Sequence, residues 1–331
     1  MTDILARLLP SRFGPAKTTD DGSDLILPTM SERVRAWWNG DPPPRVRPVE
    51  GEADETNAAA QAAVLPMSVD GKERWTAERM RLAEQLWGES FCSPGGVDFI
   101  LELLKPLALS PALTLLELGA RLGGATRAIA QSYGTWVSAY EANADLAAAA
   151  MERSARKGVE KKASIEAYDP ENFKPGKRYD RVFAKEAFFC VKNKDALMHA
   201  LADGMKPLGQ ILFTDFVLVS DDASGRALDV WRAHEPTAPA PWSVERYVWS
   251  LSEDLGLDLR VHEDMTEKYM ALIVAGWVPV VEATKRQGAD KAAMMPMLME
   301  VELWARRYAA LASGALRVYR FFAIKPTPPP Q

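Results

Sequence analysis

The sequence predicts an α/β protein built on a doubly wound, mostly parallel sheet. Short apolar runs alternate with helical segments between residues 113 and 218, which is the rhythm of strand–helix–strand units. A glycine-rich turn, Gly119-Ala-Arg-Leu-Gly-Gly124, directly follows the first of these runs. Because crossovers between parallel strands are right-handed, the helical segments are expected to cover both faces of the sheet.

Seven runs are interpreted as strands, in chain order 113–118, 136–140, 164–167, 179–184, 210–218, 257–263 and 316–324. The first is short and uniformly apolar, which is typical of a buried strand, whereas the sixth alternates apolar and polar side chains. Helices are expected over 73–87, 97–104, 126–132, 144–157, 194–205, 243–255, 265–286 and 292–312. The last two make residues 265–315 a helical insertion between strands six and seven.

The first 66 residues differ in composition from the rest of the chain. They contain Pro42-Pro43-Pro44 and an acidic patch at 50–55, which favours a loosely packed arm. A short amphipathic segment of this arm carries Trp37 and Trp38, which either pack on the main domain or provide a peripheral membrane contact. The expected division is an arm over 1–66, a main domain over 67–325 and a tail over 326–331.

Composition excludes several classes of function. The 331 residues include 40 Lys and Arg against 45 Asp and Glu, a net charge of −5, so a general nucleic-acid binder is disfavoured. Two cysteines and three histidines without metal-ligand spacing provide neither a disulfide framework nor a metal site. The N-terminus carries Asp3 where a signal peptide would be basic, and the apolar stretch at 269–282 is too short to span a bilayer. We therefore expect a soluble, cytoplasmic protein.

Three carboxylates stand where predicted strands end. Glu117 lies at the end of the first strand, Glu141 follows the second and Asp169 follows the third. Because the carboxyl ends of parallel strands share one edge of a sheet, these side chains are expected to line one crevice. Glu141 comes about 22 residues after Gly119, a spacing typical of a carboxylate that binds ribose hydroxyls. The sequence therefore predicts a nucleoside-like ligand.

NAD and S-adenosylmethionine both fit such a crevice. A dinucleotide fingerprint would read Gly-x-Gly-x-x-Gly, and here the middle glycine is replaced by Arg121. The turn begins instead with an acid two residues before its first glycine, Glu117-Leu-Gly119. This acid–x–Gly turn, with a last antiparallel strand, resembles the class I S-adenosylmethionine-dependent methyltransferases. That resemblance implies a Rossmann-like, seven-stranded sheet and S-adenosylmethionine as the cofactor, with residues 1–66 as an N-terminal extension to this domain.

Further segments resemble the phosphoethanolamine and sarcosine-type N-methyltransferases, and the resemblance covers residues 73–325. The segment Gly88-Glu-Ser-Phe-Cys-Ser-Pro-Gly-Gly96 is similar to their substrate-side loop. Residues 180–187 resemble their fourth strand, and 205–216 resemble their LKPGG…TDY segment. Order and spacing of these pieces agree with that subfamily.

The resemblance implies the residues of the site. Glu186 and His234 are the expected catalytic residues. The expected cofactor-binding residues are Glu117, Gly119, Arg121, Gly123, Gly124, Glu141, Asp169 and Lys185. The expected substrate-binding residues are Phe91, Cys92, Cys190, Phe216, Trp242 and Tyr247.

The chain also departs from that subfamily. Arg121 replaces the middle glycine of the turn, where it either pairs with the cofactor carboxylate or fills its space. Cys190 replaces the usual histidine, and Phe216 replaces a tyrosine. The Arg, Tyr and Lys that hold a phosphate in phosphobase enzymes are not matched. We therefore expect a more apolar acceptor pocket, roofed by 90–96, 234–242 and part of the insertion.

Two functions remain open at this point. One is an active methyltransferase, acting on a small molecule or a lipid headgroup and favouring N-methylation; the other is a catalytically inactive relative that serves binding or assembly. The methionine-rich insertion serves as a substrate lid or as the interface of a homodimer. No metal is expected in either case.

Overall fold

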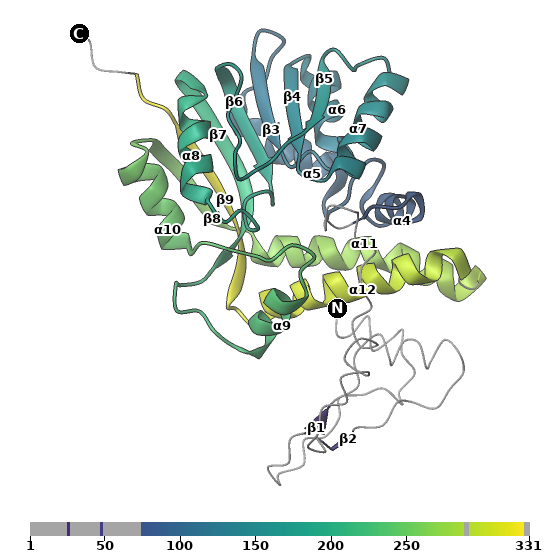
Figure 1. Ribbon diagram of the computed structural model, residues 1–331. Coiled ribbons are helices and arrows are strands. Elements are labelled where there is room, and N and C mark those ends of the chain that lie inside the picture. The colour runs from purple at the N-terminus through teal and green to yellow at the C-terminus, as the bar shows by residue number, and fades with distance from the viewer. Residues whose placement is uncertain (1–24, 27–46, 49–73, 288–290, 328–331) are drawn as a thin grey trace.

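The computed structural model describes residues 25–26, 47–48, 74–287 and 291–327 (Figure 1). Within the expected arm it describes only two short strands, β1 (Leu25–Ile26) and β2 (Arg47–Pro48), which pair antiparallel. Trp37 and Trp38, and with them the predicted membrane contact, lie outside the described residues. The main domain is described from residue 74 onward.

A seven-stranded mixed sheet forms the centre of the domain. Its strands are β3 (Thr114–Leu118), β4 (Trp136–Glu141), β5 (Ala163–Ala167), β6 (Tyr179–Lys185), β7 (Met205–Leu218), β8 (Asp258–Asp264) and β9 (Leu316–Ile324). They are arranged in the order β5-β4-β3-β6-β7-β9-β8, and β9 runs antiparallel to both of its neighbours. The predicted doubly wound sheet with an antiparallel last strand is confirmed.

Helices cover both faces of this sheet. The helices are α4 (Ala77–Trp87), α5 (Gly96–Leu103), α6 (Gly124–Tyr133), α7 (Ala144–Arg156), α8 (Lys194–Asp203), α9 (Arg226–His234) and α10 (Val244–Trp249). Alternation along β3 sends Leu115 into an apolar cluster with α5, α6 and α7, and sends Leu116 into a second cluster with α8 and α10. The sheet therefore separates two cores.

The insertion is a helical hairpin, α11 (Thr266–Gln287) and α12 (Lys291–Ala312), which lies beneath the sheet (Figure 1). It is packed tightly on α4: a Cβ atom at Gly276 would lie 2.4 Å from the ring of Trp87. The rings of Trp87 and Trp304 meet edge to face at 4.8 Å. Because these contacts are buried and aromatic, the hairpin is an integral wall of the domain.

Element boundaries differ from the expectations by a few residues, for local reasons. Helix α4 begins at Ala77 because the Thr76 hydroxyl accepts the main-chain hydrogen bond of Arg79. Strand β7 begins at Met205, five residues earlier than expected, since Met205 already pairs with Tyr179 of β6 before a shift in register. Among the described residues, no helix is long and apolar enough to cross a membrane.

Candidate active site

The glycine-rich turn joins β3 to α6 at the carboxyl edge of the sheet. Gly119, Arg121 and Gly123 all have positive φ angles, of 76°, 54° and 75°. A side chain at Gly119 would meet the Cβ of Ala187 at 2.8 Å, so this turn passes directly against the segment that follows β6. Arg121 adopts the same left-handed conformation without a glycine's freedom, which stores backbone strain at this point.

Glu141 is held in place by the turn. Its buried carboxylate accepts main-chain hydrogen bonds from Arg121 at Oε2, 2.8 Å, and from Asn143 at Oε1, 2.9 Å. Two such bonds fix the orientation of the carboxylate while its remaining lone pairs stay available for further donors. The predicted ribose-binding residue is therefore rigidly placed at the end of β4.

A cavity of about 300 Å³ opens beside Glu141 and runs along the carboxyl ends of β4, β5 and β6. On one side it is lined by Gly119, Arg121 and Glu141, together with Tyr168 and Asp169 after β5. The opposite side is formed by 189–191 and 235–237, which we call the acceptor wall, and by Glu186 and Arg307. Its volume is that of a small-molecule site.

Asp169 stands at the mouth of this cavity. Its carboxylate oxygens accept hydrogen bonds from the main chain of Glu171 and from the side chain of Asn172. The three strand-end carboxylates are thus brought to one edge of the sheet, as the sequence predicts, although Glu117 lies on the far side of the turn from the other two.

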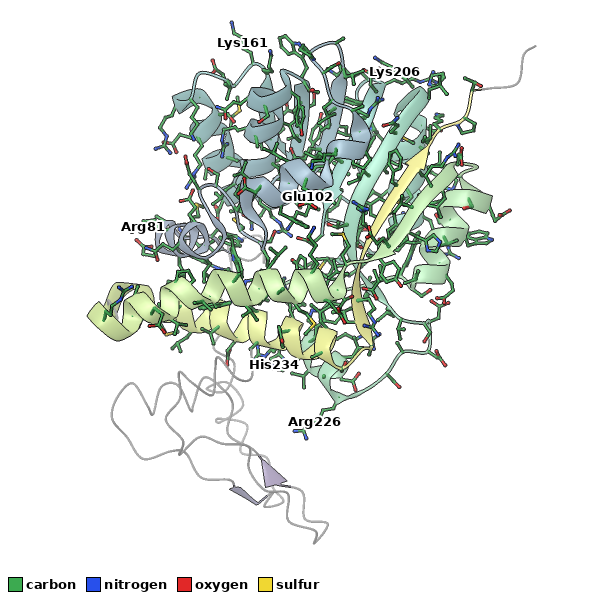
Figure 2. All side chains as sticks on the ribbon, turned by 180° about the vertical axis from the view of Figure 1, so that it is seen from behind. Arg81, Glu102, Lys161, Lys206, Arg226 and His234 are labelled. Carbon is green, nitrogen blue, oxygen red and sulfur yellow. The ribbon has the colours of Figure 1, made fainter. Side chains whose placement is uncertain are left out.

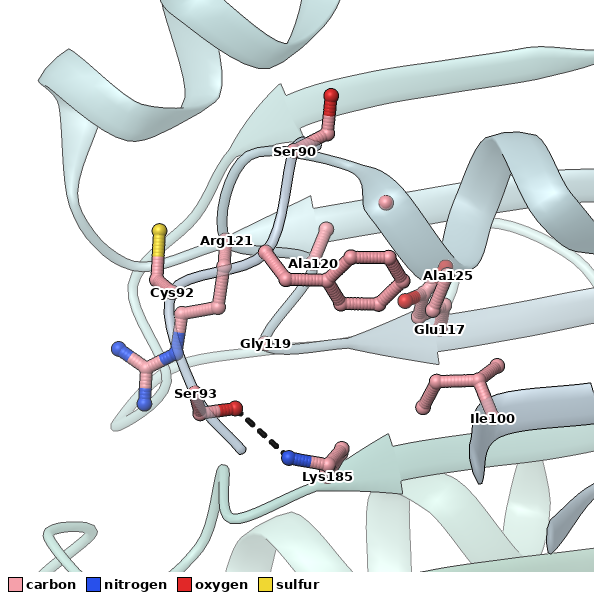
Figure 3. Close-up of a pocket in the computed structure, with 12 residues that line it drawn as sticks. Ser90, Cys92, Ser93, Ile100, Glu117, Gly119, Ala120, Arg121, Ala125 and Lys185 are labelled. Atoms are coloured by element: carbon pink, nitrogen blue, oxygen red, sulfur yellow. Dashed lines mark hydrogen bonds between the residues drawn. The ribbon is translucent and has the colours of Figure 1, made fainter. Parts of the chain in front are cut away.

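A second, much smaller hollow of about 20 Å³ lies on that far side (Figure 3). It is lined by Glu117, Lys185 and Ser93, and by Phe91 and Cys92 of the loop before α5. This volume accommodates about one water molecule. Gly119 and Arg121 line both spaces, so Arg121 stands between the cavity and the hollow.

Glu117 is an unusual buried carboxyl. It is 2 % exposed, and its Oε2 has no hydrogen-bond partner among the described residues. Burial raises the pKa of Glu117 to about 7, because the charged form loses its hydration, and the positive charge of Arg127 only partly offsets this. The acid that begins the motif is therefore poised to bind a cationic or hydrogen-bond-donating group.

Lys185 and Glu186 form an ion pair at the end of β6. Lys185 Nζ lies 2.8 Å from Glu186 Oε2 and also donates to the Ser93 hydroxyl at 2.7 Å (Figure 3). Glu186 Oε1 accepts a hydrogen bond from the hydroxyl of Thr214. Burial lowers the pKa of Lys185, while the carboxylate of Glu186 opposes that shift. Lys185 thus links the loop over the hollow to Glu186 at the cavity.

Arg307 and Glu235 are site residues that the sequence analysis missed. The guanidinium of Arg307, on α12, binds both oxygens of Glu235 at 2.7 and 2.8 Å and lies 5.9 Å from the ring centre of Phe189. These two bonds use the Nε and Nη2 groups of Arg307, so Nη1 takes no part in the pair with Glu235. The two residues lie 72 positions apart in the sequence, so no local pattern could connect them.

Phe91 and Cys92 lie on the side of the turn where the small hollow is found. Phe91 covers the turn, since a Cβ at Gly124 would lie 2.8 Å from its ring, and Cys92 is buried beside it. Both line the small hollow rather than the acceptor side of the cavity. Cys190 does line the acceptor wall, and burial raises the pKa of its thiol, which disfavours a nucleophilic role.

Four other expected site residues lie outside the cavity lining. His234 is exposed in the last turn of α9, where its Nδ1 faces the carbonyl of Val230 (Figure 2). Phe216 packs behind Phe189, with ring centres 5.1 Å apart. Trp242 and Tyr247 belong to the core on the α10 side of the sheet. None of these four side chains lines the cavity, so their roles at the site stay predictions.

The acceptor side is also more polar than expected. The whole cavity carries the carboxylates of Glu141, Asp169, Glu171, Glu186 and Glu235 and the guanidinium groups of Arg121 and Arg307. Arg307 enters because the insertion reaches the cavity, so the expectation of a roof from residues 234–242 and the insertion holds in part. Within the described residues, no group of His, Cys, Asp and Glu side chains is placed to hold a metal ion.

Comparison with known proteins places this architecture. No family model matches the chain. A solved phosphoethanolamine N-methyltransferase 2 from Haemonchus contortus, in complex with S-adenosyl-L-methionine, superposes with a TM-score of 0.65 and 19% identity, covering 85% of this chain and 62% of that one. This chain has the class I methyltransferase fold. Its resemblance to that group is thereby confirmed at the level of architecture.

Sequence comparison finds relatives of the same description. Phosphoethanolamine N-methyltransferase 2 of Caenorhabditis elegans is 28% identical over 145 residues, which is 43% of this chain and 33% of that protein. The chain thus spans about a third of that relative's length. The methyltransferase fold also occurs in the [4+2]-cyclase SpnF, which superposes with a TM-score of 0.59 at 14% identity and covers 75% of this chain and 93% of that one.

The residues present fit S-adenosylmethionine. Glu141 offers a fixed carboxylate at the cavity, and the unpartnered Oε2 of buried Glu117 lies on the other side of the turn. Only the nucleoside side has room, because the hollow at Glu117 holds about one water. The side chain of Arg121 stands between the cavity and the hollow. It would therefore have to move, or contact the cofactor directly, when the cofactor binds.

Proposed function

We propose that this protein is an S-adenosylmethionine-dependent methyltransferase that acts on a small amine. The observation that carries the proposal is the position of Glu141. Its carboxylate is oriented by the main-chain N–H groups of Arg121 and Asn143, and it lines a cavity at the carboxyl edge of the sheet. The similarity to phosphoethanolamine N-methyltransferases supports the same activity.

The cofactor site would use residues on both sides of the glycine turn. Glu141 would bind the ribose, Tyr168 and Asp169 would face the base, and Glu117 with Lys185 would surround the amino-acid end. Bound S-adenosylmethionine would supply a methyl group on a cationic sulfur. Methyl transfer to an amine is an in-line displacement, so the protein's main task is to align the two centres and exclude water.

The acceptor would bind against the acceptor wall. Glu186 faces the cavity with its carboxylate anchored by Lys185 and Thr214, so it can orient an ammonium group or accept a hydrogen bond from an amine. Arg307 lines the same space, and Arg121 lines it from the other side. An amine that also carries an anionic group satisfies both kinds of charge.

Phosphoethanolamine is therefore the first acceptor to test. Isothermal titration calorimetry with S-adenosylmethionine and with S-adenosylhomocysteine measures cofactor binding, and a radiolabelled methyl-transfer assay compares phosphoethanolamine with sarcosine, hydrophobic amines and phospholipid vesicles. We expect micromolar cofactor binding and turnover of a small anionic amine. Absence of heat with millimolar cofactor would contradict the proposal and favour the inactive, binding or assembly role.

The methyl-transfer assay also tests which acceptor is used and which of its atoms is methylated. Turnover of vesicles would identify a lipid headgroup as the acceptor, and the alternative to N-methylation is read from the methylated atom of the product. We also propose that the protein forms a homodimer through the insertion, which analytical ultracentrifugation tests. We propose a location in the cytoplasm, which cell fractionation tests. A peripheral membrane contact through Trp37 and Trp38 is tested by vesicle co-sedimentation of a Trp37→Ala/Trp38→Ala variant.

A further inference from the structure

Asp215 lies behind the acceptor wall and does not line the cavity. It is fully buried on β7, and its Oδ1 accepts main-chain hydrogen bonds from Phe188, 3.3 Å, and Phe189, 3.1 Å. Its Oδ2 accepts a hydrogen bond of 2.7 Å from the hydroxyl of Tyr247 on α10. One carboxylate thus holds the segment that follows β6 at the residue where the acceptor wall begins.

Lys194 holds the chain at Ala240, three residues after the 235–237 half of the wall. Its buried Nζ donates to the carbonyl of Ala240 at 2.6 Å, and the main-chain N–H of Ala240 donates to the carbonyl of Phe189 at 2.6 Å. The Cys190 thiol bridges the two segments once more through the carbonyl of Thr237, 3.4 Å. The two segments are therefore bonded directly to each other, and each is also held by a buried side chain, Asp215 for one and Lys194 for the other.

This arrangement is costly for stability alone. A buried carboxylate and a buried ammonium each lose their hydration, and well-packed apolar residues of similar volume are often as stabilising. What such a network provides is a defined geometry, because every hydrogen bond must be satisfied in one arrangement. Lys194 also lies 5.2 Å from the ring centre of Trp242 and 5.8 Å from that of Tyr247, which restricts it further.

We propose that Asp215, Lys194 and Tyr247 are positioning residues that set the acceptor wall from behind and thereby determine acceptor binding. The expected effect on acceptor binding rests on the proposed methyltransferase function. The expected effect on the geometry of the wall does not. Asp215 of β7 and Tyr247 are thereby assigned a role away from the substrate.

The test compares Asp215→Asn, Tyr247→Phe and Lys194→Met with wild type. We expect the acceptor KM to rise roughly tenfold in each, as for the loss of one buried hydrogen bond, with kcat and the Kd of S-adenosylmethionine changed less than about twofold. Tyr133→Phe is the matched control, since its hydroxyl bonds the Leu101 carbonyl on the other face of the sheet. An unchanged acceptor KM, or an equal loss of cofactor affinity, would overturn the proposal.

Amide hydrogen exchange tests the network without any turnover. The informative amide is Ala240, because it bonds Phe189 rather than any substituted side chain. We expect its exchange to accelerate in Asp215→Asn and in Tyr247→Phe, while the amides of Gly119 and Gly123 keep their protection. Unaltered protection at Ala240 would refute the positioning role. If wild type transfers no methyl group, the proposed function fails, and this measurement still decides the inference.

Discussion

The Nη2 group of Arg121 donates a hydrogen bond of 3.3 Å to the main-chain carbonyl of Glu186, and both residues have a left-handed backbone. The φ angles are 54° and 45°, in a region that costs most residues about 1–2 kcal/mol. Two strained residues from different loops are thus joined across the cavity. Such strain is typical of sites where geometry matters more than stability.

Replacing Arg121 with glycine is expected to weaken cofactor binding. Arg121 lines the cavity and its side-chain bond to Glu186 uses Nη2, so the other nitrogens of the guanidinium can donate to a carboxylate. Loss of a hydrogen bond to a charged group costs about 1.5–3 kcal/mol, which is roughly 10- to 100-fold in Kd by calorimetry. Tighter binding in Arg121→Gly would show instead that the side chain fills the cofactor's space.

Glu141→Ala is expected to abolish most of the affinity for S-adenosylmethionine and to lower stability. The variant leaves two main-chain N–H groups, those of Arg121 and Asn143, without their acceptor. We expect Kd to rise at least roughly tenfold in calorimetry, and urea unfolding to report a loss of about 1–3 kcal/mol. A Glu141→Gln variant retains one acceptor oxygen, so its cofactor affinity and its stability should lie between those of wild type and Glu141→Ala. Wild-type affinity in both variants would remove Glu141 from the site.

The buried acid Glu117 predicts a pH dependence of stability. Its pKa is about 7 in the folded protein and near 4.5 in the unfolded chain, so the folded state holds an extra proton between these values. The free energy of unfolding should therefore fall as pH rises from about 4.5 to 7 and stay lower above 7, by up to about 3 kcal/mol.

Glu117→Gln isolates this contribution, since glutamine cannot ionise. Urea denaturation at pH 5 and pH 8 should show the variant gaining stability relative to wild type at the higher pH. Asp215, whose pKa burial raises to about 7, titrates in the same window but is present in both proteins and cancels in the comparison. A difference between variant and wild type that does not vary with pH would contradict the assignment.

The ion pair between Arg307 and Glu235 is expected to anchor the insertion to the acceptor wall. Glu235→Gln leaves a mostly buried guanidinium without its counter-charge, and breaking a buried pair costs about 3–5 kcal/mol. Urea unfolding measures the loss, and a double-mutant cycle with Arg307→Met isolates the coupling. Arg232→Gln, in an exposed pair with Asp229, is the control and should change stability by less than about 1 kcal/mol.

The central strands of this domain could be predicted from the sequence because they are short apolar runs, and β8 could be predicted because apolar and polar side chains alternate along it. Leu115 and Leu116 illustrate this: one faces each core, so both must be apolar. The glycine turn and the strand-end acids followed from the same topology. Glu117, Glu141 and Asp169 were predictable because parallel strands end at one edge of the sheet.

The acceptor side could not be predicted in the same way, since its residues meet through tertiary packing. Thr214 and Phe216 face the cavity side of β7, whereas Asp215 between them faces α10, where Tyr247 joins it. Tyr247 was expected at the substrate, whereas its hydroxyl bonds Asp215 in the core on the α10 side of the sheet. Arg307 was missed because a lone arginine on a helix has no signal until its partner, Glu235, is known.

Leu208 offers a test of local strain far from the site. It has a φ angle of 60°, is 61 % exposed and donates its main-chain N–H to the carbonyl of Lys325. Leu208→Gly removes the clash of Cβ in the left-handed conformation and loses little buried area. The strain energy removed is larger than the free-energy cost of the more flexible unfolded chain. We therefore expect the free energy of unfolding in urea to rise by about 0.5–1 kcal/mol. Gly209→Ala should act oppositely, because its Cβ would lie 2.6 Å from the carbonyl of Lys206. A destabilised Leu208→Gly variant would show that the leucine side chain contributes more than its exposure indicates.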